Sequence, residues 1–383
     1  MKDTHPMMRL AVVAPNWIGD AVMSLPLVGA LAASEVRTSI IAREYVARVY
    51  AGVDGVAELV VGAGGARARR IFRLARTLDA LACDATVVLP PSFSAALGSF
   101  FGGARNRVGY ATDARRALLH DALDARGLRT EHVRNNYMRL GRRAVERAGG
   151  RFRTGHEPSL IVHEKDGRAA GVALARAGVP GFGDGTHAAR GAGGAHDDSN
   201  VPGARIVSNA PVAGGTYVVI VPGATYGPAK TWPADRFKEL ARKLSSDLPV
   251  VLAGSEADRA RCESMASGLR GVFSVAGGTS IGAFFALLQG ARAVVANDSG
   301  AVHVSATLGV PTVVLFGSTS PIWTAPRGPS VDIVREPVAC SPCFRRTCPT
   351  HLECFAGIDV SRVLTTVRDR LSSPALAGGR RPA

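Results

Sequence analysis

The segment 296–317, ANDSGAVHVSATLGVPTVVLFG, carries the residues best suited to hold a phosphate. An apolar run ends in Asp298, Ser299 and Gly300, and a short helical pattern follows directly. The free N–H groups and the positive dipole end of such a helix favour an anion, and Gly300 lets a ligand approach the backbone closely. His303 follows one turn later, on the adjacent face. We therefore predict a phosphate-bearing ligand; the alternatives are capping by Asp298 and packing by His303.

A second turn, PGATYGPAKTWP at 222–233, follows another apolar run and suits a diphosphate. Gly223 and Gly227 keep its backbone open, Thr225 offers a hydroxyl, and Lys230 is one of only five lysines. A lysine on a glycine-rich turn beside a strand end can neutralise a diphosphate as a point charge. Taken alone the lysine could be a solvated loop charge, and the spacing is not that of a Walker motif. Together with the Asp-Ser-Gly turn, it favours diphosphate binding.

Acidic residues follow the next predicted strand, in AGSEADRAR at 253–261. Glu256 and Asp258 could both accept a hydrogen bond from a ribose hydroxyl, as acidic residues after a βα turn commonly do. Either could instead serve only the first turn of a helix, where acidic side chains are favourable. The two interpretations are evenly balanced.

The first turn of the chain, PNWIGDAVMSLP at 15–26, differs from a dinucleotide fingerprint because no GxGxxG follows the strand. It presents one carboxylate, Asp20, where the next helix begins. From the local sequence, helix capping is the more common use of such a residue. The functional alternative is a carboxylate at the mouth of a ligand-binding cleft.

Four cysteines lie together in CSPCFRRTCPTHLEC, at Cys340, Cys343, Cys348 and Cys354. The opening C-x2-C spacing could enclose zinc or an iron–sulfur cluster. The gaps are tight, however, and no second CxxC pair appears. We expect reduced thiols that order a loop rather than a metal site, with these four as the candidate ligands if a metal is present.

Strand and helix patterns alternate along both halves of the chain, which predicts parallel βαβ units and an α/β fold. The expected strands lie at 10–15, 38–42, 58–61, 85–90, 107–110, 216–224, 247–254, 272–278, 291–297 and 311–317. We predict two doubly wound, Rossmann-like domains at 1–178 and 216–371. Between them, 179–215 is expected to be a glycine-rich linker or insertion without order, and 372–383 a frayed tail.

Composition narrows the class of partner. The 383 residues carry a formal net charge of +15, and all but five of the 46 basic residues are arginine. Such a chain suits acidic substrates or anionic membrane surfaces, although GC-rich codon usage would also enrich arginine, alanine and glycine. Aromatic residues make up only 6%, and no nucleic-acid-binding motif appears. No apolar run is long enough to span a membrane and no signal peptide is evident, so we expect a cytoplasmic protein.

These motifs together resemble the ADP-heptose:lipopolysaccharide heptosyltransferases, glycosyltransferase family 9. The matching stretches are APNWIGDAVMSLPL, LPPSFSAALGSFF, RVGY, PGATYGPAKTWPADRF, ANDSGAVHVSATLGVPTVVLFGSTSP and CSPCFRRTCP. They span nearly the whole chain outside 181–215, and the cysteine segment is typical of the heptosyltransferase II branch. The resemblance implies the GT-B architecture, in which two Rossmann-like domains face each other across a cleft.

The resemblance also implies a reaction: L-glycero-D-manno-heptose passes from ADP-heptose to the inner-core heptose of heptosyl-Kdo2-lipid A, with inversion. Asp20 matches the general base, Lys230 the diphosphate contact, and the turn at 298–300 with His303 the diphosphate cradle. The donor is implied to bind the C-terminal domain and the acceptor the N-terminal domain, without a cofactor or divalent metal. Heptosyltransferase I or III, a GT-B nucleotide-sugar epimerase and a non-catalytic binding protein are the alternatives.

The acceptor of such an enzyme is an anionic lipid, which would give the arginine excess a purpose. Arg105, Arg107, Arg115 and Arg116, on both sides of the RVGY stretch, are the candidate acceptor contacts. The same residues could form a solvated face. We expect a cytoplasmic enzyme in peripheral contact with the inner membrane.

Overall fold

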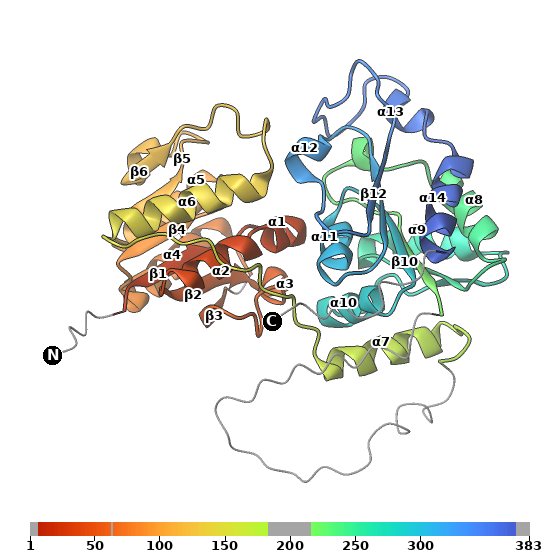
Figure 1. Cartoon of the computed structure of the whole chain (residues 1–383), viewed down its shortest axis with the longest axis horizontal. Helices are drawn as coiled ribbons and strands as arrows, with labels where there is room; N and C mark the ends of the chain where they lie inside the picture. Colours follow the sequence, from red (N-terminus) through yellow and green to blue (C-terminus); the bar gives the residue numbers. More distant parts are fainter. Residues whose placement is uncertain (1–6, 63, 183–215, 373–383) are drawn as a thin grey trace, which may run out of the picture. The chain divides into compact units, whose positions relative to one another are not determined.

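The computed structural model describes residues 7–62, 64–182 and 216–372. It divides into two units. The first comprises Met1–Ile161 with Ile322–Ala325, and the second Val162–Pro321 with Pro326–Ala383. Each unit has its own parallel sheet and its own core (Figure 1).

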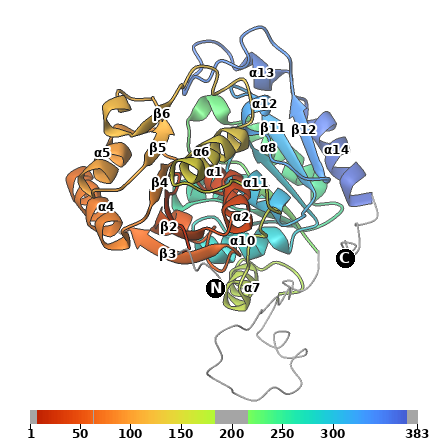
Figure 2. The same ribbon diagram turned by 60° about the vertical axis from the view of Figure 1, so that its left-hand side comes forward.

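The first unit is built on a six-stranded sheet in the order β3-β2-β1-β4-β5-β6, with every pair parallel. Its strands are β1 (Arg9–Val13), β2 (Arg37–Arg43), β3 (Val56–Gly62), β4 (Ala85–Val88), β5 (Arg107–Tyr110) and β6 (Asp121–Leu123). Its helices are α1 (Ile18–Met23), α2 (Leu25–Ala33), α3 (Glu44–Ala47), α4 (Arg67–Leu81), α5 (Phe93–Phe101) and α6 (Val133–Arg147), with a 3-10 turn η1 (Arg116–Leu118). Figure 2 shows α4 and α5 packed side by side.

The second unit repeats this strand order, β12-β11-β10-β7-β8-β9, again all parallel. Its strands are β7 (Val218–Val221), β8 (Val250–Leu252), β9 (Val272–Ser274), β10 (Ala293–Asn297), β11 (Thr312–Phe316) and β12 (Val331–Arg335). Its helices are α7 (Glu164–Arg176), η3 (Pro228–Lys230), α8 (Ala234–Leu244), η4 (Glu256–Asp258), α9 (Arg259–Ala266), α10 (Ile281–Gln289), α11 (Gly300–Thr307), α13 (Glu353–Ala356) and α14 (Val360–Ser372). The short α12 (Pro321–Thr324) falls mostly in the segment grouped with the first unit.

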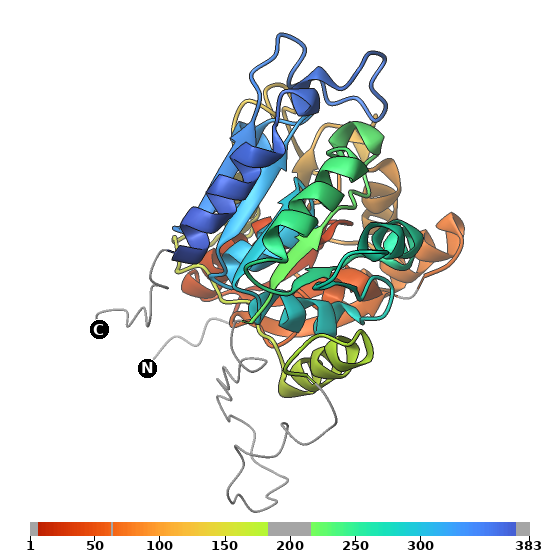
Figure 3. The same cartoon turned by 90° about the vertical axis from the view of Figure 1, so that its right-hand side faces the viewer.

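The central strands of both sheets are mostly apolar because helices cover both faces. Strands β4, β7, β10 and β11 are buried at every position. In Figure 3, α14 lies beside α8, and both contribute side chains to the core of the second unit. The strand order reverses between β1 and β4 and between β7 and β10. Ligands of such sheets bind at these switch points, outside the carboxyl ends of the strands.

The predicted α/β class with two doubly wound units is confirmed. The unit boundary differs from the predicted one, because α7 was placed in the N-terminal domain and instead packs on α10. The reason is steric: Gly282 of α10 leaves space for Asp166 of α7, whose Oδ1 would lie 2.1 Å from a Cβ at that position. Most of the predicted linker (183–215) and tail (373–383) lies outside the described residues.

Candidate functional site

Asn297, at the end of β10, fixes the geometry of the switch point in the second unit. Its Oδ1 accepts a hydrogen bond of 2.9 Å from the backbone N–H of Trp232, and its Nδ2 donates one of 2.9 Å to the carbonyl of Pro222. Asn297 is fully buried. A single side chain thus joins the end of β10 to both ends of the glycine-rich turn after β7.

Lys230 and Asp298 meet at this switch point. Lys230 Nζ lies 2.8 Å from Asp298 Oδ2, and their side chains are only 15% and 4% exposed. The hydroxyl of Thr319, after β11, donates to the same carboxylate oxygen at 2.7 Å. The N-cap of α11 is Ser299 and not Asp298, so capping by Asp298 is not what the structure shows. Asp298 instead holds Lys230 in place beside the start of α11.

Two hydroxyls near this ion pair have no hydrogen-bond partner within the described residues. The Oγ of Ser299 makes no capping bond, and the Oγ of Ser318, in a residue only 1% exposed, is also unpaired. Buried hydroxyls are ordinarily hydrogen-bonded, so a pair of unsatisfied ones marks a place where a polar ligand fits. Ser299 was predicted; Ser318, in the GSTS stretch after β11, was missed because a serine after a strand has no distinctive local pattern.

The remaining predicted donor residues lie around the same strand ends. Gly300 begins α11, and His303 is buried within it at 4% exposure and makes polar contacts there. Thr225 is exposed on the turn after β7. These placements bring the three residues to the carboxyl edge of one sheet, as a ligand site there requires.

The two candidate ribose acids have different surroundings. Asp258 Oδ2 accepts hydrogen bonds from the backbone N–H and the hydroxyl of Ser255, at 3.0 and 2.7 Å, and so closes a capping box. Glu256 has a side chain that is 72% exposed and pairs with Arg259 at 2.6 Å. The hydrogen bond from Arg259 lowers the pKa of Glu256, which therefore stays ionised. Asp258 is engaged by its own helix, whereas Glu256 faces solvent.

The cysteine segment supports both turns of this site. The backbone N–H of Phe344 donates to the carbonyl of Ser318 at 2.8 Å, and its carbonyl accepts from the Tyr226 hydroxyl at 2.7 Å. The carbonyl of Arg346 accepts from the N–H of Ala229 at 3.0 Å. The segment therefore orders the walls of the switch point through its backbone.

The thiols themselves are reduced. Burial, followed by the neighbouring thiols Cys340, Cys343 and Cys348, raises the pKa of Cys354 to about 11. The hydroxyl of Thr350, 3.3 Å from Cys348 Sγ, lowers the pKa of that thiol. Within the described part of the chain, no group of three or more histidine, cysteine or acidic side chains is arranged to hold a metal ion.

In the first unit, Asp20 lies in the first turn of α1, but the N-cap is Trp17, with no side-chain capping bond. Asp20 is half-buried, and the phenols of Tyr50 and Tyr137 lie within electrostatic range. Burial raises the pKa of Tyr137 well above its usual value, and the hydrogen bond and charge of Asp20 raise it further. The capping alternative for Asp20 is therefore not supported.

Two of the predicted acceptor arginines have a local role instead, which corrects that prediction. Arg107 donates to the carbonyls of Leu118 and Ala104 at 2.8 and 2.7 Å. Arg115, 1% exposed, donates to the carbonyl of Tyr110 at 2.9 Å, and burial lowers its pKa to about 10. Their guanidinium groups donate hydrogen bonds to backbone carbonyls around β5.

The other two, Arg105 and Arg116, are exposed. No contact of theirs indicates an acceptor. Their assignment stays a prediction.

A cavity of about 540 Å³ lies at the carboxyl ends of β1 to β4, between these strands and helices α4 and α5. Arginines line it: Arg43, Arg67, Arg70, Arg73 and Arg76. The last four follow one another at intervals of three in α4, so that each is a neighbour of the next on the helix surface. The three-residue spacing of these arginines can be read from the sequence, but only a helix is predicted there.

No helix in the part of the chain that the structure describes is long and apolar enough to cross a membrane.

Two doubly wound parallel units of this kind are the architecture of the GT-B fold. The structure of E. coli ADP-heptose LPS heptosyltransferase II superposes with a TM-score of 0.71, at 24% identity, covering 95% of this chain and 98% of that one. The model of glycosyltransferase family 9 (heptosyltransferase) matches residues 183–353. That match covers slightly less than half of the chain.

Curated relatives agree. Lipooligosaccharide heptosyltransferase 2 of Haemophilus ducreyi is 27% identical over 346 residues, 86% of this chain and 88% of that protein. Lipopolysaccharide heptosyltransferase 1 of Pseudomonas aeruginosa is 34% identical over a shorter stretch, 42% of this chain and 50% of that protein. The chain is thus similar in sequence to named heptosyltransferases.

Proposed function

We propose that the chain transfers L-glycero-D-manno-heptose from ADP-heptose to the inner-core heptose of heptosyl-Kdo2-lipid A. The observation that carries this proposal is the site at the β7/β10 switch point. There a buried lysine, a helix N-terminus and unsatisfied hydroxyls converge, as a nucleoside diphosphate requires. Relatives named heptosyltransferase 2 support the choice of sugar and acceptor.

In this proposal the donor diphosphate lies against Lys230 and the first N–H groups of α11. Ser299 and Ser318 donate their free hydroxyls to its oxygens. Glu256 accepts from the ribose hydroxyls, because it is the exposed acid of the pair and lies just after β8. The lysine and the helix dipole together offset the charge that grows on the leaving ADP, so we expect no divalent metal or cofactor to be required.

Asp20 is the general base of the proposed reaction. The acceptor hydroxyl oxygen attacks the anomeric carbon of heptose while its proton passes to the Asp20 carboxylate. The bond between the anomeric carbon and the diphosphate oxygen breaks, and ADP leaves with that electron pair. One displacement without a covalent enzyme intermediate inverts the anomeric centre. Partial burial of Asp20 supports this role because desolvation makes a carboxylate a stronger base.

The arginine-lined cavity of the first unit is the proposed acceptor site. Five guanidinium groups around about 540 Å³ suit the carboxylates and phosphates of an inner-core lipid. Because that acceptor is anchored in a membrane, we propose that the enzyme works in the cytoplasm, in peripheral contact with the inner-membrane surface. The net charge of +15 supports contact with an anionic surface.

The test is ADP release from ADP-heptose with each of two purified acceptors. Release with heptosyl-Kdo2-lipid A and little with Kdo2-lipid A is the expected result. The reverse preference would assign heptosyltransferase I activity, which the Pseudomonas aeruginosa relative makes the second candidate. No release with either acceptor would contradict the proposed reaction.

A further inference from the structure

The buried ion pair between Lys230 and Asp298 adds no net formal charge to the proposed donor site. The Lys230 ammonium group lies 2.8 Å from the Asp298 carboxylate, so the two charges offset each other. A nucleoside diphosphate carries more than one negative charge, and it is held best where a cation without a carboxylate of its own can reach it. Arg346, in the cysteine segment at 340–354, is such a cation.

The ring of Tyr226 brings Arg346 close to Lys230. The guanidinium carbon of Arg346 lies 5.3 Å from the centroid of this ring, and Lys230 Nζ lies 5.7 Å from the same centroid. An aromatic face attracts both kinds of cation. Tyr226 is half-buried, and its hydroxyl donates to the carbonyl of Phe344 at 2.7 Å, which fixes the ring. Two cations therefore lie near one ring on the turn after β7.

The backbone of Arg346 is held by the same turn. Its carbonyl accepts a hydrogen bond of 3.0 Å from the N–H of Ala229, the residue directly before Lys230. Gly227 makes this approach possible, because a Cβ there would lie 2.6 Å from the carbonyl oxygen of Arg346. The positions of the two cations are thus coupled through the backbone as well as through the ring.

The cysteine segment is also hydrogen-bonded to the stretch after β11. Ser341 Oγ donates to the carbonyl of Gly317 at 2.6 Å, and the N–H of Phe344 donates to the carbonyl of Ser318 at 2.8 Å. The Oγ of Ser318, in a residue 1% exposed, has no hydrogen-bond partner within the described residues. The segment therefore carries Arg346 to the strand ends at which a buried hydroxyl is left for a polar ligand.

Arg346 is exposed, and among the residues that the structure describes no carboxylate pairs with it. Other arginines of the second unit differ in this respect. Arg259 pairs with Glu256 at 2.6 Å, and Arg370 pairs with Asp332. The charge of Arg346 is thus available to an anion at the switch point.

We propose that Arg346 is a further donor-binding residue, whose guanidinium supplies the uncompensated positive charge that pairs with the diphosphate of the nucleotide sugar. The inference rests on the proposed function, in which ADP-heptose binds at this site. A guanidinium is planar and always charged, so it can donate two parallel hydrogen bonds to one phosphate. Contact with the Tyr226 ring orients it before the ligand arrives, which reduces the conformational freedom lost on binding.

The experiment measures the Kd of ADP by titration calorimetry for the full-length wild type, Arg346→Gln, Arg346→Lys and Arg345→Gln. Each is measured at low and high salt, together with its melting temperature. Arg345 is the matched control because it is an exposed arginine at the adjacent position.

For Arg346→Gln we expect the Kd of ADP to rise about tenfold at low salt, as the loss of a charge-assisted contact implies. The difference from the wild type should become smaller at high salt, because the contact is ionic and exposed. Arg346→Lys keeps the charge and should recover part of the affinity. Arg345→Gln should stay within about twofold of the wild type, and all four melting temperatures should agree.

An Arg346→Gln protein that binds ADP as tightly as Arg345→Gln would overturn the inference. Weaker ADP binding with a lower melting temperature and the wild-type salt dependence would also overturn it, because the residue would then only support the turn. If the wild type does not bind ADP, the proposed donor site is wrong and the inference falls with it. If Lys230→Met weakens ADP binding and Arg346→Gln does not, the donor site stands and only the inference fails.

Discussion

Lys230 and Asp298, far apart in the sequence, form a buried ion pair of 2.8 Å where the strand order of the second unit reverses. The pair brings a cation to the start of α11 and lets a third residue, Thr319, share the carboxylate. Each partner was predicted as a separate phosphate contact. Their contact instead shows that the Asp298 carboxylate is paired with the Lys230 ammonium group.

Replacing Lys230 by methionine should weaken ADP binding and destabilise the fold. Asp298, at 4% exposure, would lose its lysine partner, which costs about 3 kcal/mol in comparable sites. The double variant Lys230→Met/Asp298→Asn should recover the stability but not the affinity for ADP. Denaturant unfolding and titration calorimetry separate the two effects. Equal ADP affinity in wild type and Lys230→Met would contradict the donor site.

Removing the hydroxyl of Ser318 should affect ligand binding but not folding. Its Oγ is buried without a partner in the described chain, so Ser318→Ala should change the unfolding free energy by less than about 0.5 kcal/mol. The loss of one donor to the diphosphate should lower ADP affinity about tenfold. Thr319→Val is the matched control, because that hydroxyl serves Asp298 and its loss should reduce stability. Unchanged ADP affinity in Ser318→Ala would remove the residue from the site.

Gly227 allows the close approach of the cysteine segment to the donor turn. A Cβ at this position would lie 2.6 Å from the carbonyl oxygen of Arg346, a contact that requires the backbone to move. Gly227→Ala should therefore displace the turn that carries Lys230 and raise the KM for ADP-heptose, with little change in the KM for the acceptor. Gly171→Ala in α7, where a Cβ meets nothing within 4 Å, should leave both KM values unchanged. A wild-type donor KM in Gly227→Ala would show that the segment does not support the turn.

The arginines of α4 should control the acceptor and not the donor. Arg70→Gln/Arg73→Gln should raise the KM for the lipid acceptor by about tenfold. The difference in KM from the wild type should become smaller at high salt, because the interaction is ionic. Arg105→Gln, which removes an exposed arginine outside the cavity lining, is the comparison. If Arg105→Gln has the larger effect, the original sequence prediction holds and the cavity is not the acceptor site.

Much of the fold was legible in the sequence because buried parallel strands are continuous apolar runs. Strands β1, β4, β7 and β10 follow that rule, and the polar turns after β1, β7 and β10 were predicted as ligand-binding. Strands β6 and β12 were missed because both lie at sheet edges and are half-exposed, which removes the pattern. Local periodicity does not show which sheet a helix packs against. For that reason α7 was predicted in the N-terminal domain, whereas the structure groups it with the second unit.

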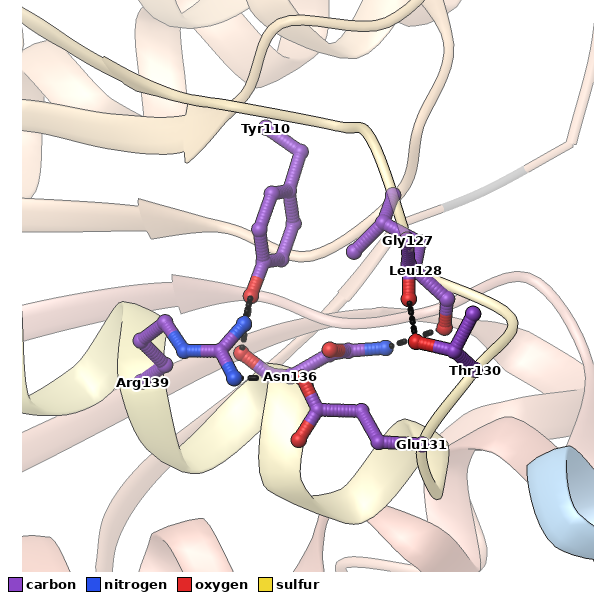
Figure 4. Close-up of polar contacts among 7 residues, drawn as sticks. All are labelled: Tyr110, Gly127, Leu128, Thr130, Glu131, Asn136 and Arg139. Atoms are coloured by element: carbon purple, nitrogen blue, oxygen red, sulfur yellow. Dashed lines mark hydrogen bonds and ion pairs between the residues drawn. The ribbon is translucent and has the colours of Figure 1, made fainter.

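The same limit applies to the candidate site. Residue types and spacing led to the predictions for Lys230 and the turn at 298–300, because phosphate binding uses local chemistry. The sequence did not reveal that Arg115 serves the backbone carbonyls around β5, since an arginine that binds carbonyls and one that binds a ligand have the same local pattern. The hydrogen bond of 3.0 Å from the Tyr110 hydroxyl to the carbonyl of Asn136 joins β5 to α6 and needed the fold (Figure 4).

The most direct test of the proposed reaction is ADP release from ADP-heptose in the presence of heptosyl-Kdo2-lipid A, comparing wild type with Asp20→Ala. We expect acceptor-dependent release by the wild type and a loss of activity of at least about a hundredfold in Asp20→Ala. ADP-heptose binding should be unchanged, because only the proton acceptor has been removed. Full activity in Asp20→Ala, with the same acceptor dependence, would contradict it.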